Sequence, residues 1–355
     1  MSELIEFEYK DLETLTDNFS EENFIYHAQY CKLYRGKIPK GWKGMECRVV
    51  TVKVWVDEAF VFPPQAYKRS WEKNLENFRD EIMILEHRST MLSPNLPKLM
   101  GFFHEDTTQR LGVVYDLESI DVLENLFDKE RFGWHNRIKV ALGLAKILEH
   151  FHGNQPRYLI RDFSTAHIML DKDFNAVLFN FFGFTGGVLG EKIKGQDIMS
   201  RKVLGSLRYV DLWIFNSETW KESMDVYSFG IILLELIRKR KVCTLAEPKT
   251  TSFEYEGHLQ KMYKRRKSKL LGESRCSLVD QRFEIDESFH VSDGCRISKL
   301  AMECVRYRDE CLNAKEIVEK LNKMRIVKKP PSSRRLVVPR KRHCGWMVSF
   351  RFFGW

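Results

Sequence analysis

The chain has 355 residues, of which 43% are hydrophobic and 30% are charged, and this composition excludes an intrinsically disordered protein. Its net charge of +9 comes almost entirely from residues 326–355, which hold eight Lys or Arg side chains and no acidic one. The first 325 residues are nearly neutral, which argues against nucleic-acid binding by the folded body.

The cysteines and the apolar stretches indicate the cellular compartment. The eight cysteines include no CxxC pair and no His partners at metal-ligand spacing, so we expect reduced thiols. The segment MSELIEFEYKD has acids where a signal peptide has an apolar run. The longest apolar stretch, residues 229–237, is too short to cross a bilayer and contains Glu235. The sequence therefore predicts a cytoplasmic protein.

The first part of the chain predicts a small lobe rich in β-strands. Residues 34–56 show a strand, a turn with Gly and Pro, and a second strand whose β-branched side chains suit a sheet. Apolar residues spaced three and four apart across 71–85 predict an amphipathic helix. Two further strands are expected at 97–103 and 111–117.

The rest of the chain predicts a helical lobe. Helices are expected at 138–151, 225–236 and 297–321, with a hairpin at 167–179 around the turn DKDFN. The predicted fold class is therefore α+β with two lobes. The expected divisions are an N-terminal extension (1–19), a sheet-rich lobe (20–117), a helical lobe (118–325) and a basic, aromatic, disordered tail (326–355).

Three motifs in a fixed order give the chain a resemblance to protein kinases. TVKV holds Lys53 in a strand, IRDFSTAHIML holds Arg161 and Asp162 before the hairpin, and DVYSFGIILLEL forms the apolar helix. The segments LTDNFSEEN, LRYV, LVDQRF and EIVEKL are similar to those of plant receptor-like cytoplasmic kinases. The resemblance covers roughly residues 10–325 and implies the two-lobed protein kinase fold.

The resemblance also implies the residues of a site between the lobes, with ATP as cofactor. Lys53 would pair with Glu81, and Arg161 and Asp162 would belong to the catalytic loop. Cofactor contacts are further implied for Ile25 and Leu33 around the phosphate-covering loop and for Asp116 and Leu117 in the hinge.

Two more groupings are expected to hold this site together. Leu85, Ile160 and Phe181 would form an apolar stack that joins the lobes, and Asp225 would accept hydrogen bonds from the backbone of the catalytic loop.

The loop over the phosphates departs from the family pattern. Glycines let backbone N–H groups approach phosphate oxygens, because no Cβ stands in the way. Tyr26, Gln29 and Cys31 occupy the three glycine positions here. The side chain of a tyrosine at this position would occupy the space that the phosphates of ATP need.

The family's magnesium ligands are missing as well. His167 stands where the family has an Asn, and Asn180 where it has the Asp of the DFG motif; in a register one residue later, Phe181 would take that place. Mg²⁺ prefers anionic oxygen ligands, so we expect no metal site. Zinc at His167 is not expected either, because suitably spaced Cys and His partners are absent. Asp162 keeps either a residual role as a base or structural hydrogen bonds alone.

Two functions remain open from the sequence. One is a pseudokinase that serves as an adaptor or switch in plant receptor-kinase or immune signalling, with a receptor, an active kinase or an immune receptor as its protein partner. The other is a weakly active ATP-dependent Ser/Thr kinase that recruits a metal through Asn180 or another acid. ATP, without a firm magnesium requirement, is the one candidate cofactor of the pseudokinase, and the sequence leaves open whether it binds.

The expected activation segment offers candidate modification sites. Thr185, Ser200 and Ser206 could be phosphorylated and held by Arg161, or could be ordinary loop hydroxyls. Trp213 and Cys311 stand where the family has an acid and its arginine partner, so both charges of that ion pair are missing together.

The tail has three interpretations. PRKRH could serve nuclear import or nucleic-acid binding, whereas basic residues alternating with aromatic ones, together with Cys344, would suit weak contact with the plasma membrane. A disordered extension without function is the third and slightly preferred interpretation. Nucleic acid is therefore not expected as a partner.

Overall fold

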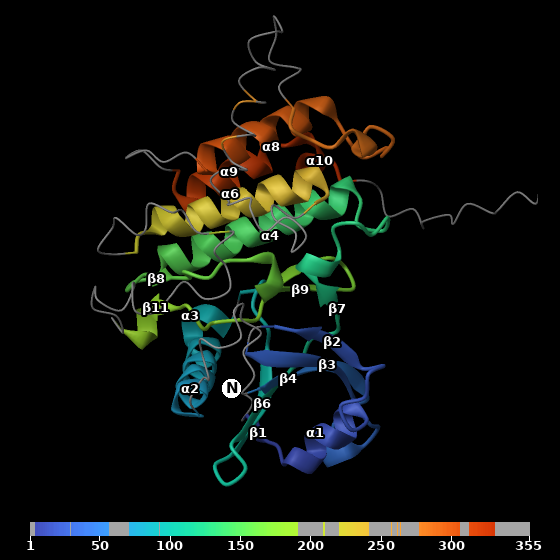
Figure 1. Ribbon diagram of the computed structural model, residues 1–355, viewed down its shortest axis with the longest axis vertical. Helices are drawn as coiled ribbons and strands as arrows, with labels where there is room; N and C mark the ends of the chain where they lie inside the picture. The colour runs from blue at the N-terminus through green and yellow to red at the C-terminus, as the bar shows by residue number, and fades with distance from the viewer. Residues whose placement is uncertain are drawn as a thin grey trace, which may run out of the picture.

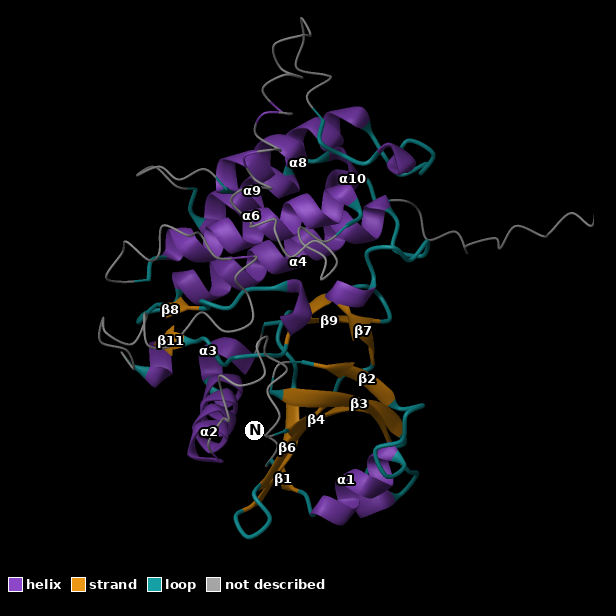
Figure 2. Ribbon diagram, in the orientation of Figure 1, coloured by secondary structure: helices purple, strands orange, loops and turns teal. Residues whose placement is uncertain are grey.

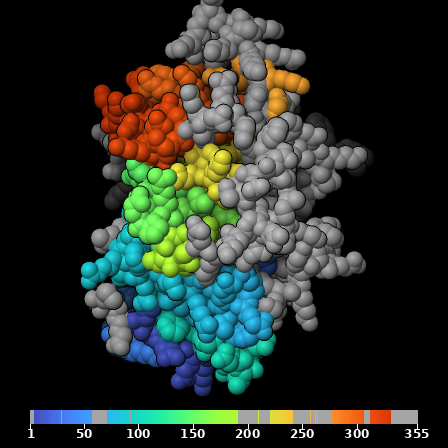
Figure 3. Space-filling view, turned by 90° about the vertical axis from the view of Figure 1, so that its left-hand side faces the viewer, coloured from blue at the N-terminus to red at the C-terminus, as the bar shows by residue number. Residues whose placement is uncertain are grey.

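The computed structural model describes residues 4–28, 30–56, 71–91, 93–190, 209, 220–240, 257, 261, 263, 277–305 and 312–330. These residues form a sheet-rich N-terminal lobe and a helical C-terminal lobe (Figure 1, Figure 2). In the space-filling view, the blue and cyan N-terminal lobe and the orange and red C-terminal helices lie at opposite ends (Figure 3). The predicted two-lobed α+β class is confirmed.

The N-terminal lobe is built on a six-stranded sheet with strand order β1-β5-β6-β4-β3-β2. Its centre is the predicted hairpin, in which β3 and β4 stay in register from Cys31 opposite Trp55 to Ile38 opposite Arg48. Val50 and Val52 of β4 are fully buried, as β-branched residues in a central strand usually are. The strands are β1 (Ile5–Glu6), β2 (Phe24–His27), β3 (Cys31–Ile38), β4 (Arg48–Trp55), β5 (Leu99–Glu105) and β6 (Arg110–Tyr115).

The N-terminal segment belongs to this sheet, although the sequence predicts an extension up to residue 19. β1 pairs parallel to β5, with Ile5 opposite Gly101, and helix α1 (Tyr9–Thr16) follows it. Leu12 and Leu15 of α1 are buried in a second hydrophobic cluster with Val50 and Val52. The lobe therefore begins before residue 20, because these side chains cover a face of the sheet that would otherwise be exposed.

Gly101→Ala should detach β1 from the sheet. A Cβ at this position would lie 2.0 Å from the carbonyl oxygen of Ile5 and 2.6 Å from the ring of Phe7. We expect a loss of about 1–3 kcal/mol in the free energy of unfolding, measured by urea denaturation of the full chain. Gly153→Ala is the control, since a Cβ there meets no atom within 4 Å. Equal effects of the two variants would contradict the placement of β1.

Helix α2 (Trp71–Glu86) lies beside the sheet, followed by the short helix α3 (Arg88–Met91) (Figure 1). The predicted helix is confirmed; of its apolar residues spaced three and four apart, Phe78 and Leu85 are buried, and Trp71, Leu75 and Ile82 are partly buried against the same hydrophobic cluster. The same buried face carries Glu81, which is thereby brought toward β4.

The C-terminal lobe packs around α6, whose residues from Met224 to Ile237 are all buried. The predicted hairpin is confirmed, since β9 and β10 pair antiparallel and β7 joins them. No helix among the described residues is long and apolar enough to cross a membrane. The elements include β7 (Ser119–Val122), α4 (Trp134–Gly153), β8 (Tyr158–Leu159), β9 (Ile168–Asp171), β10 (Ala176–Leu178), β11 (Thr185–Gly186), α6 (Glu222–Arg238), α8 (Val291–Cys304), α9 (Ala314–Asn322) and α10 (Arg325–Lys328).

The predicted helical stretch 297–321 is wrong as a single element. α8 ends at Cys304, and α9 begins at Ala314 behind an Asn313 N-cap that exchanges hydrogen bonds with Glu316. Such a capping box starts a new helix because it satisfies backbone N–H groups that have no partner within the helix.

The predicted start of the tail at 326 also shifts. Helix α10 continues to Lys328, Ile326 is 6% exposed, and the backbone N–H groups of Arg325 and Ile326 donate to the buried carboxylate of Asp293. Residues 331–355 lie outside the described residues.

Candidate active site

The predicted ion pair between the strand lysine and the helix glutamate is confirmed. Lys53 Nζ of β4 lies 2.5 Å from Glu81 Oε2 of α2, and both side chains are 2% exposed. The ammonium also donates to the carbonyl oxygen of Phe179 at 2.9 Å and lies 4.5 Å from the ring centroid of Trp55. Lys53 is thus enclosed by groups of the protein itself.

The tyrosine that ends β6 completes this buried network. The Tyr115 hydroxyl donates to Glu81 Oε1. Burial raises the pKa of Glu81, although the nearby Lys53 ammonium lowers it, and burial together with Glu81 raises the pKa of Tyr115 well above its usual value. The charges of Lys53 and Glu81 are therefore both buried, and the attraction between them offsets the free energy lost when each charge leaves water.

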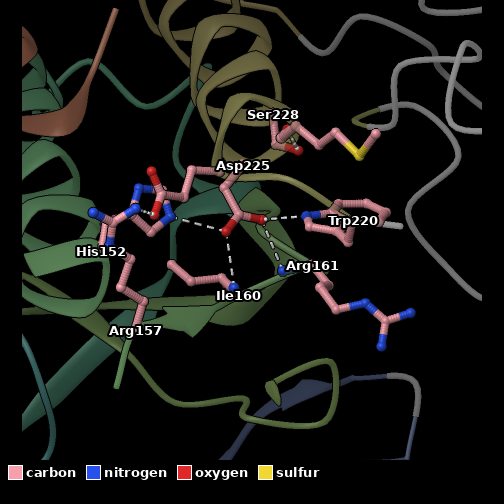
Figure 4. Close-up of polar contacts among 9 residues, drawn as sticks. His152, Arg157, Ile160, Arg161, Trp220, Asp225 and Ser228 are labelled. Carbon is pink, nitrogen blue, oxygen red and sulfur yellow. Dashed lines mark hydrogen bonds and ion pairs between the residues drawn. The ribbon is translucent and has the colours of Figure 1, made fainter. Parts of the chain in front are cut away.

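Asp225 holds the catalytic loop, as the sequence predicts. Its fully buried carboxylate accepts the backbone N–H groups of Ile160 at 2.9 Å and Arg161 at 2.8 Å. His152 Nε2 lies 3.0 Å from Oδ2, and Trp220 Nε1 donates to Oδ1 at 3.1 Å (Figure 4). The anchor fixes Arg161 in the left-handed region, with φ of 65°.

Arg161 itself turns away from this anchor (Figure 4). Its guanidinium carbon lies 5.6 Å from the ring centroid of Trp220. Thr185, one of the candidate modification sites, lies in β11 and pairs with Leu159 of β8. The other two, Ser200 and Ser206, lie outside the described residues, as do Trp213 and Cys311.

Asp162 and His167 lie side by side where the sequence places the catalytic loop. His167 Nδ1 is 3.6 Å from Asp162 Oδ2, 3.0 Å from the Asp162 carbonyl oxygen and 3.2 Å from Ser164 Oγ. The Asp162 side chain is 12% exposed, and both carboxylate oxygens lack a hydrogen-bond partner in the described structure. The group that would act as a base is present, with an imidazole beside it.

The contacts of the residues around Asn180 bear on the register of this segment. Phe181 is buried in the same hydrophobic cluster as Leu85 and Ile160, as the predicted stack requires. Asn180 Oδ1 accepts the backbone N–H of Phe182 at 3.1 Å, so this amide closes its own turn. This is the arrangement expected if Asn180, rather than Phe181, stands at the position of the family's metal-binding acid.

No group of three or more His, Cys, Asp or Glu side chains suited to a metal ion occurs among the described residues. A protein kinase site uses Mg²⁺ bound by carboxylate and amide oxygens near the phosphates. Here a carboxamide bonded to its own turn and an imidazole bonded to Ser164 and Asp162 stand at the two ligand positions. The imidazole does not fit a hard divalent cation, and the carboxamide oxygen of Asn180 is a neutral ligand that already accepts the backbone N–H of Phe182.

The loop that should cover the phosphates makes contacts of its own. The Tyr26 hydroxyl of β2 donates to Glu124 in the C-terminal lobe, 98 residues further along the chain. The ring of Tyr30, only 6% exposed, packs edge-on against Phe182 with 5.1 Å between centroids. Gln29 lies outside the described residues, and Cys31 is buried. Two tyrosines thus connect this loop to the lobe below it.

The backbone groups of Asp116 and Leu117 in the expected hinge make hydrogen bonds within the protein. The Asp116 N–H donates to the Lys98 carbonyl at 2.9 Å, and the Leu117 N–H to the Tyr115 carbonyl at 2.8 Å. The Leu117 carbonyl already accepts the Thr51 hydroxyl at 2.8 Å. Both predicted backbone donors are therefore in use within the protein. Ile25 and Leu33 lie in β2 and β3 and border the same hydrophobic cluster.

Four residues of this arrangement escaped sequence reasoning: His152, Trp220, Tyr115 and Glu124. Tyr115 could have been found, because it directly precedes the expected hinge. The other three contact the site only through tertiary packing, and no local pattern marks them.

Comparison with known proteins gives the same family as the motifs, the protein kinases. Residues 54–324 match the protein kinase domain. The chain is 33% identical over 249 residues to the probable serine/threonine-protein kinase PBL26 of Arabidopsis thaliana, covering 68% of this chain and 54% of that protein. It is 31% identical over 248 residues to the probable serine/threonine-protein kinase PBL22 of the same plant, covering 68% and 58%.

A further relative is a plant receptor-like cytoplasmic kinase by name. The EPD1-interacting receptor-like cytoplasmic serine/threonine-protein kinase 5D of Gossypium barbadense is 30% identical over 244 residues, covering 68% of this chain and 48% of that protein. The chain thus spans about half the length of the curated relatives that it matches. Because a single domain match extends over most of its length, the chain belongs to the protein kinase domain family.

Proposed function

We propose that this protein is a pseudokinase that acts as an adaptor or switch in plant receptor-kinase or immune signalling, through protein partners in the cytoplasm. The observation that carries the proposal is the enclosure of Lys53. In a kinase this lysine contacts the phosphates of ATP. Here the side chain is 2% exposed, and its ammonium donates to the carbonyl of Phe179 in addition to Glu81, the partner that it also has in active kinases.

The replaced metal ligands support the same conclusion. If the missing cations cost about 5 kcal/mol of transition-state stabilisation, the rate of phosphoryl transfer falls by between roughly three and four powers of ten. Asp162 has a carboxylate that can accept a proton. Without metal ions to neutralise the charge of the phosphates, however, the phosphoryl group would not be transferred.

The covering loop supports it on steric grounds. Tyr26 and Tyr30 stand within the loop that needs open backbone over phosphate; Tyr26 donates a hydrogen bond to Glu124, and the ring of Tyr30 packs against Phe182. A nucleotide would have to displace both contacts before its phosphates reached Lys53.

One observation favours the weak Ser/Thr kinase as a second candidate. Asp162 keeps a carboxylate whose two oxygens are free of hydrogen bonds in the described structure, next to an intact Lys53–Glu81 pair. Such an enzyme would need ATP and a metal held by residues other than His167 and Asn180.

Thermal unfolding of the full chain with ATP, in Mg²⁺ and in chelator, separates these functions. A site filled at about 100 times its dissociation constant stabilises a protein by about 2.7 kcal/mol, and we expect no such stabilisation of the wild type. Tyr26→Gly/Tyr30→Gly is the informative variant, because an ATP-dependent shift that appears only there shows that the tyrosines close the site.

Phosphate incorporation from ATP gives the second measurement. The proposal predicts none above the background set by Asp162→Asn, and it predicts that this variant keeps its signalling role in plant cells. A magnesium-dependent thermal shift together with incorporation that Asp162→Asn abolishes would establish the weak kinase instead.

A further inference from the structure

A groove at the far end of the C-terminal lobe has an apolar floor. It encloses about 220 Å³ between α8 and the α9–α10 segment, above Ile297, Leu300 and Met324. A cavity of about 150 Å³ holds a benzene-sized group, so this groove has room for one aliphatic side chain.

The rim of this groove is basic. Arg296, Lys299, Lys320 and Lys323 face a single acid, Glu303, which pairs with Lys320 at 3.1 Å. Lys299 and Lys323 are exposed, and neither ammonium has an ion pair within the described part of the chain. The groove therefore suits an apolar side chain flanked by carboxylates.

The chain carries such a side chain on the loop before α8. Ile285 is 90% exposed, the highest value among the exposed large hydrophobic side chains of the described residues. Glu284 and Glu287 on either side are exposed, and their carboxylates form no ion pair within the described residues. Asp286 fixes the loop by accepting the Trp134 N–H at 2.7 Å and the Ser288 hydroxyl at 2.6 Å.

This knob, residues 284–287, precedes the N-terminal end of α8, whereas the groove lies further along the same helix, from Arg296 to Glu303. Val291, at the start of α8 and 50% exposed, shares a helix face with Cys295 and Lys299, since the three are spaced four apart. If two copies pack with their α8 helices antiparallel, the knob of each copy meets the groove of the other. Such a dimer has two-fold symmetry, and both copies contribute the same surface to the interface.

We propose that this surface joins two copies of the chain, with Ile285 of each copy seated between Lys299 and Lys323 of the other. The contact does not depend on whether the cleft transfers phosphate. Residues 331–355 are a poor occupant of the groove, because they carry basic residues and no acid.

Sedimentation velocity of the full chain from low to high micromolar concentration tests the proposal. The wild type should dimerise, and Ile285→Asp should raise the dimer dissociation constant at least about tenfold. Glu284→Lys/Glu287→Lys and Lys299→Glu/Lys323→Glu should each be monomeric, and an equimolar mixture of the two should dimerise again.

The mixture is decisive because both of its knob–groove contacts regain opposite charges. Glu22→Lys/Glu46→Lys is the control, since it changes the net charge by the same amount as Glu284→Lys/Glu287→Lys but at exposed residues of the N-terminal lobe. A wild type that stays monomeric overturns the proposal and leaves the groove to a different protein. A mixture that stays monomeric overturns it as well.

Discussion

Lys53→Met should lower the free energy of unfolding by about 3–5 kcal/mol near neutral pH, as expected when one partner of a buried ion pair is removed. Glu81 would remain 2% exposed with only the Tyr115 hydroxyl bonded to its carboxylate. Lys53→Met/Glu81→Gln should be less destabilised than Lys53→Met, because the glutamine leaves no buried charge and still accepts the tyrosine hydroxyl.

The pH dependence of Lys53→Met has a definite sign. Burial raises the pKa of Glu81 in the folded protein, and removal of Lys53 takes away the main influence that lowers it. A carboxyl with a raised folded-state pKa contributes stability below its unfolded pKa and loses it as the pH rises through the folded pKa. Acidification from about pH 7 to about pH 5 should therefore narrow the gap between Lys53→Met and the wild type.

Urea denaturation of the wild type and both variants at several pH values measures this effect. The double variant is the control: it lacks the titrating carboxyl, so its difference from the wild type should change less with pH than that of Lys53→Met, whose Glu81 pKa is raised further. A gap for Lys53→Met that stays constant across the same range would mean that Glu81 is reached by water once the lysine is gone.

The parts of the fold that sequence predicts well are those with a local signal. The apolar periodicity of α2 and the β-branched run of β4 reflect the faces that these elements bury. Once the kinase motif identifies Lys53 on β4 and Glu81 on α2, the pairing of these two side chains can be predicted. β1 carries no such signal, because its two residues become a strand only by pairing with β5 across a glycine.

The contacts of the phosphate-covering loop illustrate what a motif leaves open. Three missing glycines predict a poor phosphate loop, yet they do not say what the replacements contact. The Tyr26–Glu124 hydrogen bond and the Tyr30–Phe182 contact join residues far apart in sequence. The backbone hydrogen bonds of Asp116 and Leu117 are equally invisible to a motif, since they are made to the neighbouring Lys98, Tyr115 and Thr51.

Asp225→Ala should cost about 3–5 kcal/mol, because it leaves the backbone N–H groups of Ile160 and Arg161 buried without an acceptor. Trp220 and His152 would lose the same partner. Arg161 has a positive φ, which costs conformational energy, and the hydrogen bonds to Asp225 offset this cost. Amide hydrogen exchange at 160 and 161 should therefore speed up more than exchange elsewhere in the lobe.

Glu222→Ala provides the matched control for Asp225→Ala, since it removes an acid from the same first turn of α6. Glu222 pairs with Arg157 at 2.8 Å, but the arginine side chain is 58% exposed and the glutamate 35%. Such surface pairs contribute about 0–1 kcal/mol, so this variant should stay close to the wild type. Similar losses in the two variants would show that the effect comes from the helix end, whereas a large loss confined to Asp225→Ala locates it in the buried anchor that shapes the catalytic loop.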